Sequence, residues 1–192
     1  MLFFLWLKSS NKLPMLIVFV LLVPLGIGFM PASWTDRMNT IKTYEQDASA
    51  MGRINAWTNA FNIANDRPLV GGGFELYSVR VFAKYAPDPT DVHAAHSVYF
   101  QILGEHGYAG LLIYLSIMIS VWLRANRVIN YGKGKPEFDW AVGMVRAVQV
   151  SIVGFSAGGL FVNIGYWELL YYELLIVIVA YRIVFAGQPA RR

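Results

Sequence analysis

The sequence predicts an all-α integral membrane protein with about four transmembrane helices and one large, partly helical outer loop. Two observations predict this class. Only 15% of the 192 residues are charged, against about 25% in an average soluble domain, so there are too few polar groups to cover a water-exposed surface. The apolar residues make up 56% of the chain, and they are grouped into runs long enough to cross a bilayer.

The composition also argues against two other classes of protein. The chain has far more apolar surface to bury than a disordered chain would have. The net charge is only +4, and the basic residues do not form the dense stripe that is typical of nucleic-acid binders. The sequence has no cysteine, so cysteine usage says nothing about the redox compartment.

Four segments have the apolar length of a spanning helix, about 20 residues for a hydrocarbon core of roughly 30 Å. They are residues 13–30, 108–123, 141–161 and 169–185. Residues 1–12 are interpreted as the end of a preceding span or an interfacial anchor, because the apolar run MLFFLWL is too short to cross. A signal peptide is the alternative for residues 1–33, but an apolar FFLWL before the basic residues is unusual for one.

The positions of Lys and Arg predict the orientation of the chain. Basic residues gather before the first span, in the loop 124–140 and in the tail 186–192. With four spans, all three groups fall on one side, which is predicted to be cytoplasmic. The loop 31–107 then faces outward, and its six Lys/Arg and eight Asp/Glu give it no positive excess.

The outer loop is too long to be a mere connection. An apolar stripe at helical spacing predicts one helix within it, made by Met51, Ile54, Trp57, Phe61 and Ala64. Pro68 and the run Gly71–Gly73 are expected to end that helix. Because the glycine run lacks the Lys-Ser/Thr of a phosphate loop, it predicts a tight turn. Arg53 is rotated about 40° from Trp57 around the helix axis, which places it at the edge of the stripe. It is interpreted either as a snorkelling interfacial arginine or as a site residue.

All three histidines of the chain, His93, His96 and His106, fall within 14 residues. The turn Pro87–Asp91 predicts a helix that starts near Asp91, on which His93 and His96 would share a face. Three interpretations are open. They are a metal site with Glu105, for which no second ligand pair is evident, structural hydrogen bonding, and a general base or phosphate ligand.

Several short motifs follow one another in this loop. They are Arg53-x-x-x-Trp57, then Pro68-Leu69-x-Gly71-x-Gly73-Phe74, then His96-Ser97-x-Tyr99-Phe100-x-x-Leu103-Gly104-Glu105-x-Gly107, followed by a span. In this order and place they resemble the C-terminal portion of the O-antigen ligase and O-antigen polymerase superfamily. The string HAAHSVYFQILGEHGYAGLL is most similar to the O-glycosylation ligases that accompany exosortase systems. The resemblance covers about residues 50–115.

This resemblance implies a metal-independent glycosyltransferase of the bacterial inner membrane, similar to the GT-C type architecture, with its site facing the periplasm and no cofactor. It would move a glycan from an undecaprenyl-pyrophosphate carrier to an acceptor hydroxyl. The family's loop histidine corresponds to His96, as the base, and its loop arginine to Arg53, as a pyrophosphate ligand. The other candidate substrate-binding residues are His93, Arg67, Arg80 and Glu105.

These residue types suit the reaction, because an imidazole can accept the hydroxyl proton and a guanidinium matches phosphate oxygens. Without a metal, several arginines are expected to share that role, and Arg37 and Lys84 are further helpers. The alternatives are a polymerase, a non-catalytic protein that binds lipid-linked glycan, and a transporter. Related proteins have more spans, so we expect this chain to be a C-terminal fragment that is inactive alone. The acceptor stays open: lipid A core, a protein or a growing polysaccharide.

Overall fold

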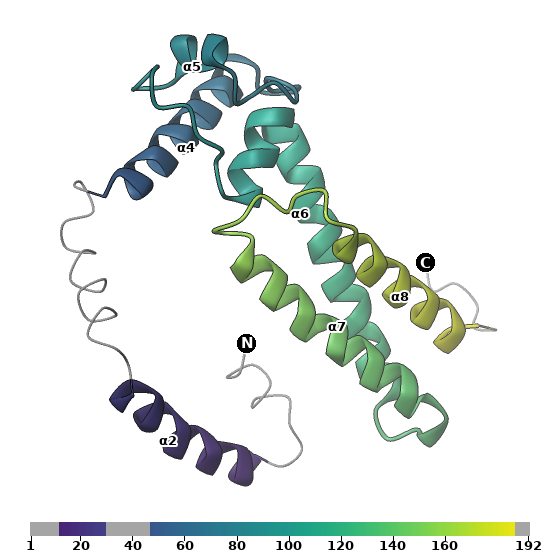
Figure 1. The fold of residues 1–192 in the computed structure, drawn as a ribbon. Coiled ribbons are helices and arrows are strands. Elements are labelled where there is room, and N and C mark those ends of the chain that lie inside the picture. Colours follow the sequence, from purple (N-terminus) through teal and green to yellow (C-terminus); the bar gives the residue numbers. More distant parts are fainter. Residues whose placement is uncertain (1–11, 30–46, 187–192) are drawn as a thin grey trace.

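The computed structural model describes residues 12–29 and 47–186, and all regular structure in these residues is helical. Most of the predicted N-terminal anchor, the first part of the outer loop with Arg37, and most of the tail lie outside the described residues. Figure 1 shows the helices in order: α2 (Lys12–Gly28), α4 (Ala48–Asp66), α5 (Val79–Tyr85), α6 (Val98–Gly132), the short 3₁₀ helix η2 (Pro136–Phe138), α7 (Asp139–Gly158) and α8 (Glu168–Val184). The all-α prediction is confirmed for the described part of the chain.

Helices occupy all four segments that were predicted to span the membrane. Two stretches of the described chain are long and apolar enough to cross a bilayer, Val98–Gly132 and Pro136–Gly158. The helices α2 and α8 are shorter, at 17 residues each. Many large apolar side chains on α6, α7 and α8 are exposed, among them Leu112, Ile119, Met144, Leu175 and Val179. Such exposed apolar faces are typical of helices that contact lipid.

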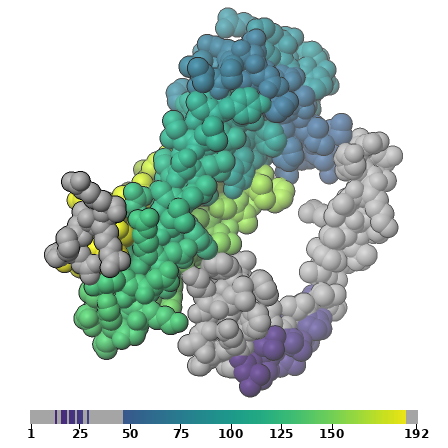
Figure 2. Space-filling view, turned by 180° about the vertical axis from the view of Figure 1, so that it is seen from behind, coloured from purple at the N-terminus to yellow at the C-terminus, as the bar shows by residue number. Residues whose placement is uncertain are grey.

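Helices α6, α7 and α8 pack along one another and form the main core (Figure 1). Small β-branched and alanine side chains dominate the contact, and Val121, Val128, Val145 and Val177 are each fully buried. Helix α4 packs on the first part of α6, at the end away from the α6–α7 turn, and α5 packs on α4 (Figure 2). Residues 47–97 therefore form a compact cap on one end of the three-helix bundle.

Helix α6 is broken at Gly107, whose backbone has φ 66 and ψ −168. The left-handed φ is open to glycine at little cost, and the chain turns back on itself there. Each side of a break leaves helix-end groups without intrahelical partners. The carbonyl oxygen of Pro68 accepts a hydrogen bond from the Tyr108 amide at 2.8 Å, so it caps the second half of α6.

The glycine-rich run caps the first half of α6. The amide of Gly72 donates to the carbonyl oxygen of Gly104 at 2.8 Å, and the amide of Gly73 donates to that of Glu105 at 3.0 Å. The run adopts left-handed backbone at Gly71 (φ 61) and Gly73 (φ 77), which confirms the predicted tight turn. A segment 32 residues earlier in the chain thus stabilises the break in α6.

Helix α4 confirms the predicted outer-loop helix and its end before Pro68. Asp47 caps its first turn by accepting from the Ser49 amide at 2.9 Å. The stripe of large apolar residues is not its buried face, because Met51, Ile54 and Phe61 are exposed. The buried face holds small residues and amides: Gly52, Asn55, Ala56, Asn59, Ala60, Ile63 and Ala64. On α4, the buried face is therefore the one whose small residues let neighbouring segments approach closely. It is not the face with the largest apolar side chains.

The predicted helix start near Asp91 is wrong, because α6 begins at Val98 and residues 91–97 are not helical. The carbonyl oxygens that a local helix would use are bonded to α4 instead. The side-chain amide of Asn55 donates to the carbonyl of Asp91 at 2.9 Å, and the Trp57 indole donates to that of Ala95 at 2.6 Å. His93 and His96 therefore do not share a helix face.

Candidate functional site

A cavity of about 540 Å³ lies beside the first half of α4. Its walls come from the start of α4 and from the segment that leads into α6: Ala48, Ser49, Met51, Arg53, Asp91, His93 and His96. Three of the six predicted site residues, Arg53, His93 and His96, thus meet in one place. They are brought together by the packing of residues 88–97 along α4, and not by a shared helix.

His96 has an unusual backbone conformation. Its φ is 46, and among the described residues it is the one non-glycine residue with positive φ. Such a conformation costs energy for a residue with a Cβ and is found most often at functional sites. The His96 side chain is exposed toward the cavity.

Both flanks of His96 are held by hydrogen bonds. On one side the Ala95 carbonyl accepts from Trp57, as described above. On the other side the Ser97 amide donates to Oδ1 of Asn163 at 3.0 Å, and the Val98 amide donates to the Gly159 carbonyl at 2.8 Å. The loop between α7 and α8 therefore contributes to the position of His96.

Trp57 joins α4 to the start of α6. Its ring is stacked on that of Phe100, with ring centroids 4.9 Å apart and an interplanar angle of 5°. Parallel aromatic packing of this kind adds about 1 kcal/mol to the burial of the rings. Trp57 thus fixes both the peptide before His96 and the helix after it.

Asp91 and His93 form a close pair in the same cavity. Oδ1 of Asp91 lies 2.6 Å from Nδ1 of His93, and the two side chains are partly exposed. The segment is clamped by Asn55, which donates to the carbonyl oxygens of Asp88 and Asp91 and accepts from the Asp88 amide. Sequence reasoning treated Asp91 only as a helix cap and missed this pair.

Gly52 of α4 lies directly under the Asp91–His93 pair. A Cβ at this position would lie 3.1 Å from Nδ1 of His93 and 3.2 Å from Oδ2 of Asp91. The missing side chain is therefore what lets the pair lie against the helix. Asn55 and Gly52 were detectable in the sequence as polar and small residues on an otherwise apolar helix, but their partners were not.

Arg53 supplies a fixed positive charge to this cavity, because a guanidinium stays protonated at any ordinary pH. It lies one residue beyond Gly52 and is half-buried. The opposing charge in the cavity wall is the carboxylate of Asp91. The cavity thus combines one cation, one carboxylate and two imidazoles.

Arg67 and Arg80 do not line this cavity. Arg67 ends α4, 14 residues beyond Arg53 and therefore about 20 Å away along the helix. Arg80 lies on α5, and both side chains are exposed. Nearby, Lys84 is engaged by Asp66, with Nζ to Oδ2 at 3.3 Å.

Asp66 also accepts a hydrogen bond from the Tyr85 hydroxyl. This bond and the contact with Lys84 hold the pKa of the Asp66 carboxyl below its usual value. Lys84, a suggested helper, therefore serves an ion pair at the far end of α4.

Glu105 is buried, and it also lies outside this cavity. Its carboxylate accepts hydrogen bonds from the Tyr166 hydroxyl and, at 3.4 Å, from Nε2 of Gln101. Burial raises the pKa of Tyr166, and the bonded Glu105 adds to that shift. Nε2 of His106 lies 2.7 Å from the same hydroxyl, so Tyr166 links the loop before α8 to the first half of α6.

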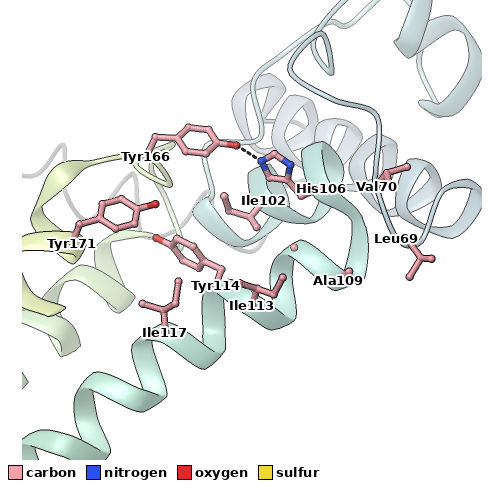
Figure 3. Close-up of a pocket in the computed structure, with 11 residues that line it drawn as sticks. Leu69, Val70, Ile102, His106, Ala109, Ile113, Tyr114, Ile117, Tyr166 and Tyr171 are labelled. Atoms are coloured by element: carbon pink, nitrogen blue, oxygen red, sulfur yellow. Dashed lines mark hydrogen bonds between the residues drawn. The ribbon is translucent and has the colours of Figure 1, made fainter. Parts of the chain in front are cut away.

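A second cavity, of about 490 Å³, lies along α6. Figure 3 shows His106 and Tyr166 joined at one end of it and Ile113, Tyr114 and Ile117 along its wall. Ile102 and Ile117 both line it although they lie on either side of the Gly107 break. Its lining is mostly apolar, so it is suited to hydrocarbon rather than to a charged group.

No three His, Cys, Asp or Glu side chains come together as a metal-binding group in the described parts of the chain. Glu105, the carboxylate considered as a third ligand for His93 and His96, is bonded to Tyr166 instead.

Comparison with protein families identifies a family for this chain. The family described as "O-Antigen ligase" matches residues 1–115. This range contains the whole first cavity and ends within α6, just after its break. Searches of curated proteins and of solved structures found no match.

Proposed function

The chain belongs to the O-antigen ligase family, and from this premise we propose that it takes part in glycan transfer at the outer face of the inner membrane. The donor is a glycan on an undecaprenyl-pyrophosphate carrier, and the acceptor is a hydroxyl group. The chain crosses the membrane four times, with residues 31–107 in the periplasm. One observation carries the proposal: Arg53 and His96, 43 residues apart in sequence, line one cavity.

His96 is the proposed base. A sugar hydroxyl is a weak nucleophile, and a positioned imidazole accepts its proton as the new bond to the anomeric carbon forms. The bond between that carbon and the pyrophosphate oxygen breaks at the same time, and its electron pair leaves with the pyrophosphate. The strained, doubly held backbone of His96 supports this role, since a base placed in advance needs no rearrangement.

Arg53 is the proposed pyrophosphate ligand. The leaving group gains negative charge as the bond breaks, and a guanidinium offers two parallel donors to phosphate oxygens. Its position in a half-buried wall favours the interaction, because charges attract more strongly where water is partly excluded. No metal is required by this scheme.

The remaining predicted residues have different proposed places. Arg67 and Arg80 would contact the donor glycan or lipid headgroups outside the cavity. Glu105 would act through Tyr166, by holding the first half of α6 in place. The apolar second cavity borders the membrane-crossing half of α6, and there it gives the lipid chain of the donor a place beside the bilayer.

Two measurements test the proposal. Binding of undecaprenyl pyrophosphate to the full chain in nanodiscs should weaken at least tenfold in Arg53→Ala. The matched control Arg127→Ala should bind like wild type, because Arg127 is an exposed arginine on the far half of α6, away from the cavity. Transfer of labelled glycan by the complete protein, in membranes that contain the natural acceptor, should fall about 10²–10⁴-fold in His96→Ala while donor binding is kept.

Three results would contradict parts of this scheme. Wild-type transfer by His96→Ala rules out the base. Donor binding by the complete wild-type protein without any transfer indicates a non-catalytic protein that binds lipid-linked glycan. Loss of transfer after exhaustive chelation, restored by a divalent cation, rules out the metal-independent scheme.

A further inference from the structure

The loop between α7 and α8 docks on the start of α6 (Figure 1). The Val98 amide donates a hydrogen bond to the carbonyl oxygen of Gly159 at 2.8 Å. The Gly165 amide donates to Oε1 of Gln101 at 3.3 Å. Both glycines permit this close approach, because a Cβ would lie 3.3 Å from a side-chain atom of Val98 at Gly159 and 3.2 Å from Oε1 of Gln101 at Gly165. The loop is thus held against α6 at two points.

Asn163 lies between these two points of the loop and caps α6 from outside the helix. Ser97 is the N-cap residue of α6, and its own side chain makes no capping hydrogen bond. Its backbone amide donates instead to Oδ1 of Asn163 at 3.0 Å. Ser97 is buried, and a buried amide without an acceptor destabilises the fold. The acceptor on Asn163 therefore has a defined partner in the backbone directly after His96.

The two peptide planes that flank His96 set its backbone dihedral angles, because each peptide unit is rigid. The plane before His96 contains the Ala95 carbonyl, which accepts from the Trp57 indole at 2.6 Å. The plane after His96 contains the Ser97 amide, which donates to Asn163. One side chain thus holds each plane, and together they hold His96 at its φ of 46.

The left-handed conformation of His96 needs such support. It costs free energy for a residue with a Cβ, and a single hydrogen bond contributes free energy of similar size. Without the acceptor on Asn163, the plane after His96 is free to rotate, and the direction of the imidazole changes with it. We propose that Asn163 is a positioning residue that holds the His96 imidazole in place for glycan transfer. This inference rests on the proposed function, and Asn163 lies beyond residues 1–115, which match the family.

The test compares two replacements of Asn163 that have nearly the same size. Asn163→Leu removes the acceptor oxygen, whereas Asn163→Asp keeps a carboxylate oxygen for the Ser97 amide. Asn126→Leu is the matched control, because Oδ1 of Asn126 also accepts a side-chain hydrogen bond, from Nε2 of Gln149 at 2.8 Å, on the far half of α6. A merely structural role of Asn163 would lower stability alone, so the test needs measurements that report on His96 itself.

The first measurement requires no catalysis. The ring NMR signals of His96 are recorded for the full chain in phosphatidylcholine nanodiscs and are identified by their absence in His96→Gln. We expect them to shift in Asn163→Leu and to stay near their wild-type position in Asn163→Asp. In Asn126→Leu they should not change.

The second measurement is glycan transfer by the complete protein in membranes that contain the natural acceptor. We expect kcat to fall by up to about 10²-fold in Asn163→Leu, the effect of displacing a reacting group by about 1 Å. KM for the donor should not change, because Arg53 stays in place and donor binding is not affected. Asn163→Asp should recover most of the lost kcat, and Asn126→Leu should transfer like wild type.

Three results would overturn the inference. They are unchanged His96 ring signals in Asn163→Leu, a wild-type kcat in that variant, and a loss of kcat that Asn163→Asp shares in full. If Asn163→Leu does not fold, Asn163→Ala removes the same acceptor in a smaller side chain and carries the same expectations. Wild-type transfer by His96→Ala would overturn the proposed function instead, and the ring signals would still show whether Asn163 holds His96.

Discussion

The indole nitrogen of Trp57 donates a hydrogen bond to the carbonyl oxygen of Ala95 at 2.6 Å. This bond spans 38 residues of sequence and ends one residue before His96. It connects the helix that carries Arg53 to the segment that carries both cavity histidines. The relative position of the cation and the proposed base is therefore set in part by one side-chain donor.

Replacing Trp57 by Phe should loosen this connection without removing the aromatic stack on Phe100. We expect a loss of about 1–3 kcal/mol in stability, because the Ala95 carbonyl is left without its partner. Glycan transfer should fall as well, since His96 is no longer fixed. Thermal unfolding in nanodiscs and the transfer assay measure the two effects. Trp140→Phe, a change on the exposed side of α7, is the control. Equal effects of the two variants would contradict the proposed link.

The strained backbone of His96 predicts different stabilities for two variants that should both lose activity. With φ at 46, glycine adopts this conformation more easily than alanine does. His96→Gly should therefore be about 1 kcal/mol more stable than His96→Ala, whereas neither variant should transfer glycan. Chemical or thermal unfolding of both variants checks this. A less stable glycine variant would show that the conformation is not strained.

Much of the fold follows from the sequence because it depends on local patterns. Apolar run length locates the helices of the bundle, and helical spacing locates α4. The sequence places the start of the second span at residue 108, but the sharp turn at Gly107 could not be predicted from periodicity. It is stabilised by carbonyl and amide groups of Pro68, Gly72 and Gly73, and such long-range backbone pairing leaves no periodic signal.

The sequence predicted which residue types belong to the site. It did not predict how these residues are placed relative to one another. His93, His96 and Arg53 were identified as candidates, but the expected helix near Asp91 does not form. Its carbonyl groups are bound by Asn55 and Trp57 from α4. The role of Asp91 beside His93 depends on that non-helical path, in which residues two apart can meet. Three further predicted residues have side chains of a type that suits the reaction, namely Arg67, Arg80 and Glu105. Only the fold shows that they lie outside the first cavity.

Tyr77 predicts a dependence of stability on alkaline pH. Burial raises the pKa of its hydroxyl to about 12, and the nearby Glu105 carboxylate adds to the shift, whereas an unfolded tyrosine titrates near 10. The folded state thus keeps a proton that the unfolded state loses. The stabilising contribution is complete below about pH 10 and is lost as the pH rises toward about 12.

Tyr77→Phe removes this titrating group, so its stability should fall less between pH 10 and 12 than that of the wild type. Unfolding in urea at a series of pH values measures the difference. Tyr131→Phe, on the far half of α6, controls for general alkaline effects. Parallel pH profiles of wild type and Tyr77→Phe would show that Tyr77 is not held as described.

The last prediction concerns the break in α6. It compares the cost in stability of alanine at two glycines that have similar φ. At Gly107 (φ 66) a Cβ would lie 2.4 Å from the carbonyl oxygen of Pro68, whereas at Gly73 (φ 77) nothing lies within 4 Å. Gly73→Ala should cost only the left-handed conformation, about 1–2 kcal/mol. Gly107→Ala should cost about 4 kcal/mol or more, because backbone must also move. Thermal unfolding ranks the two. Since the second cavity is lined from both sides of the break, folded Gly107→Ala protein should lose binding of the donor's lipid chain. Equal stability of the two variants would show that the contact between Pro68 and Gly107 does not hold the break.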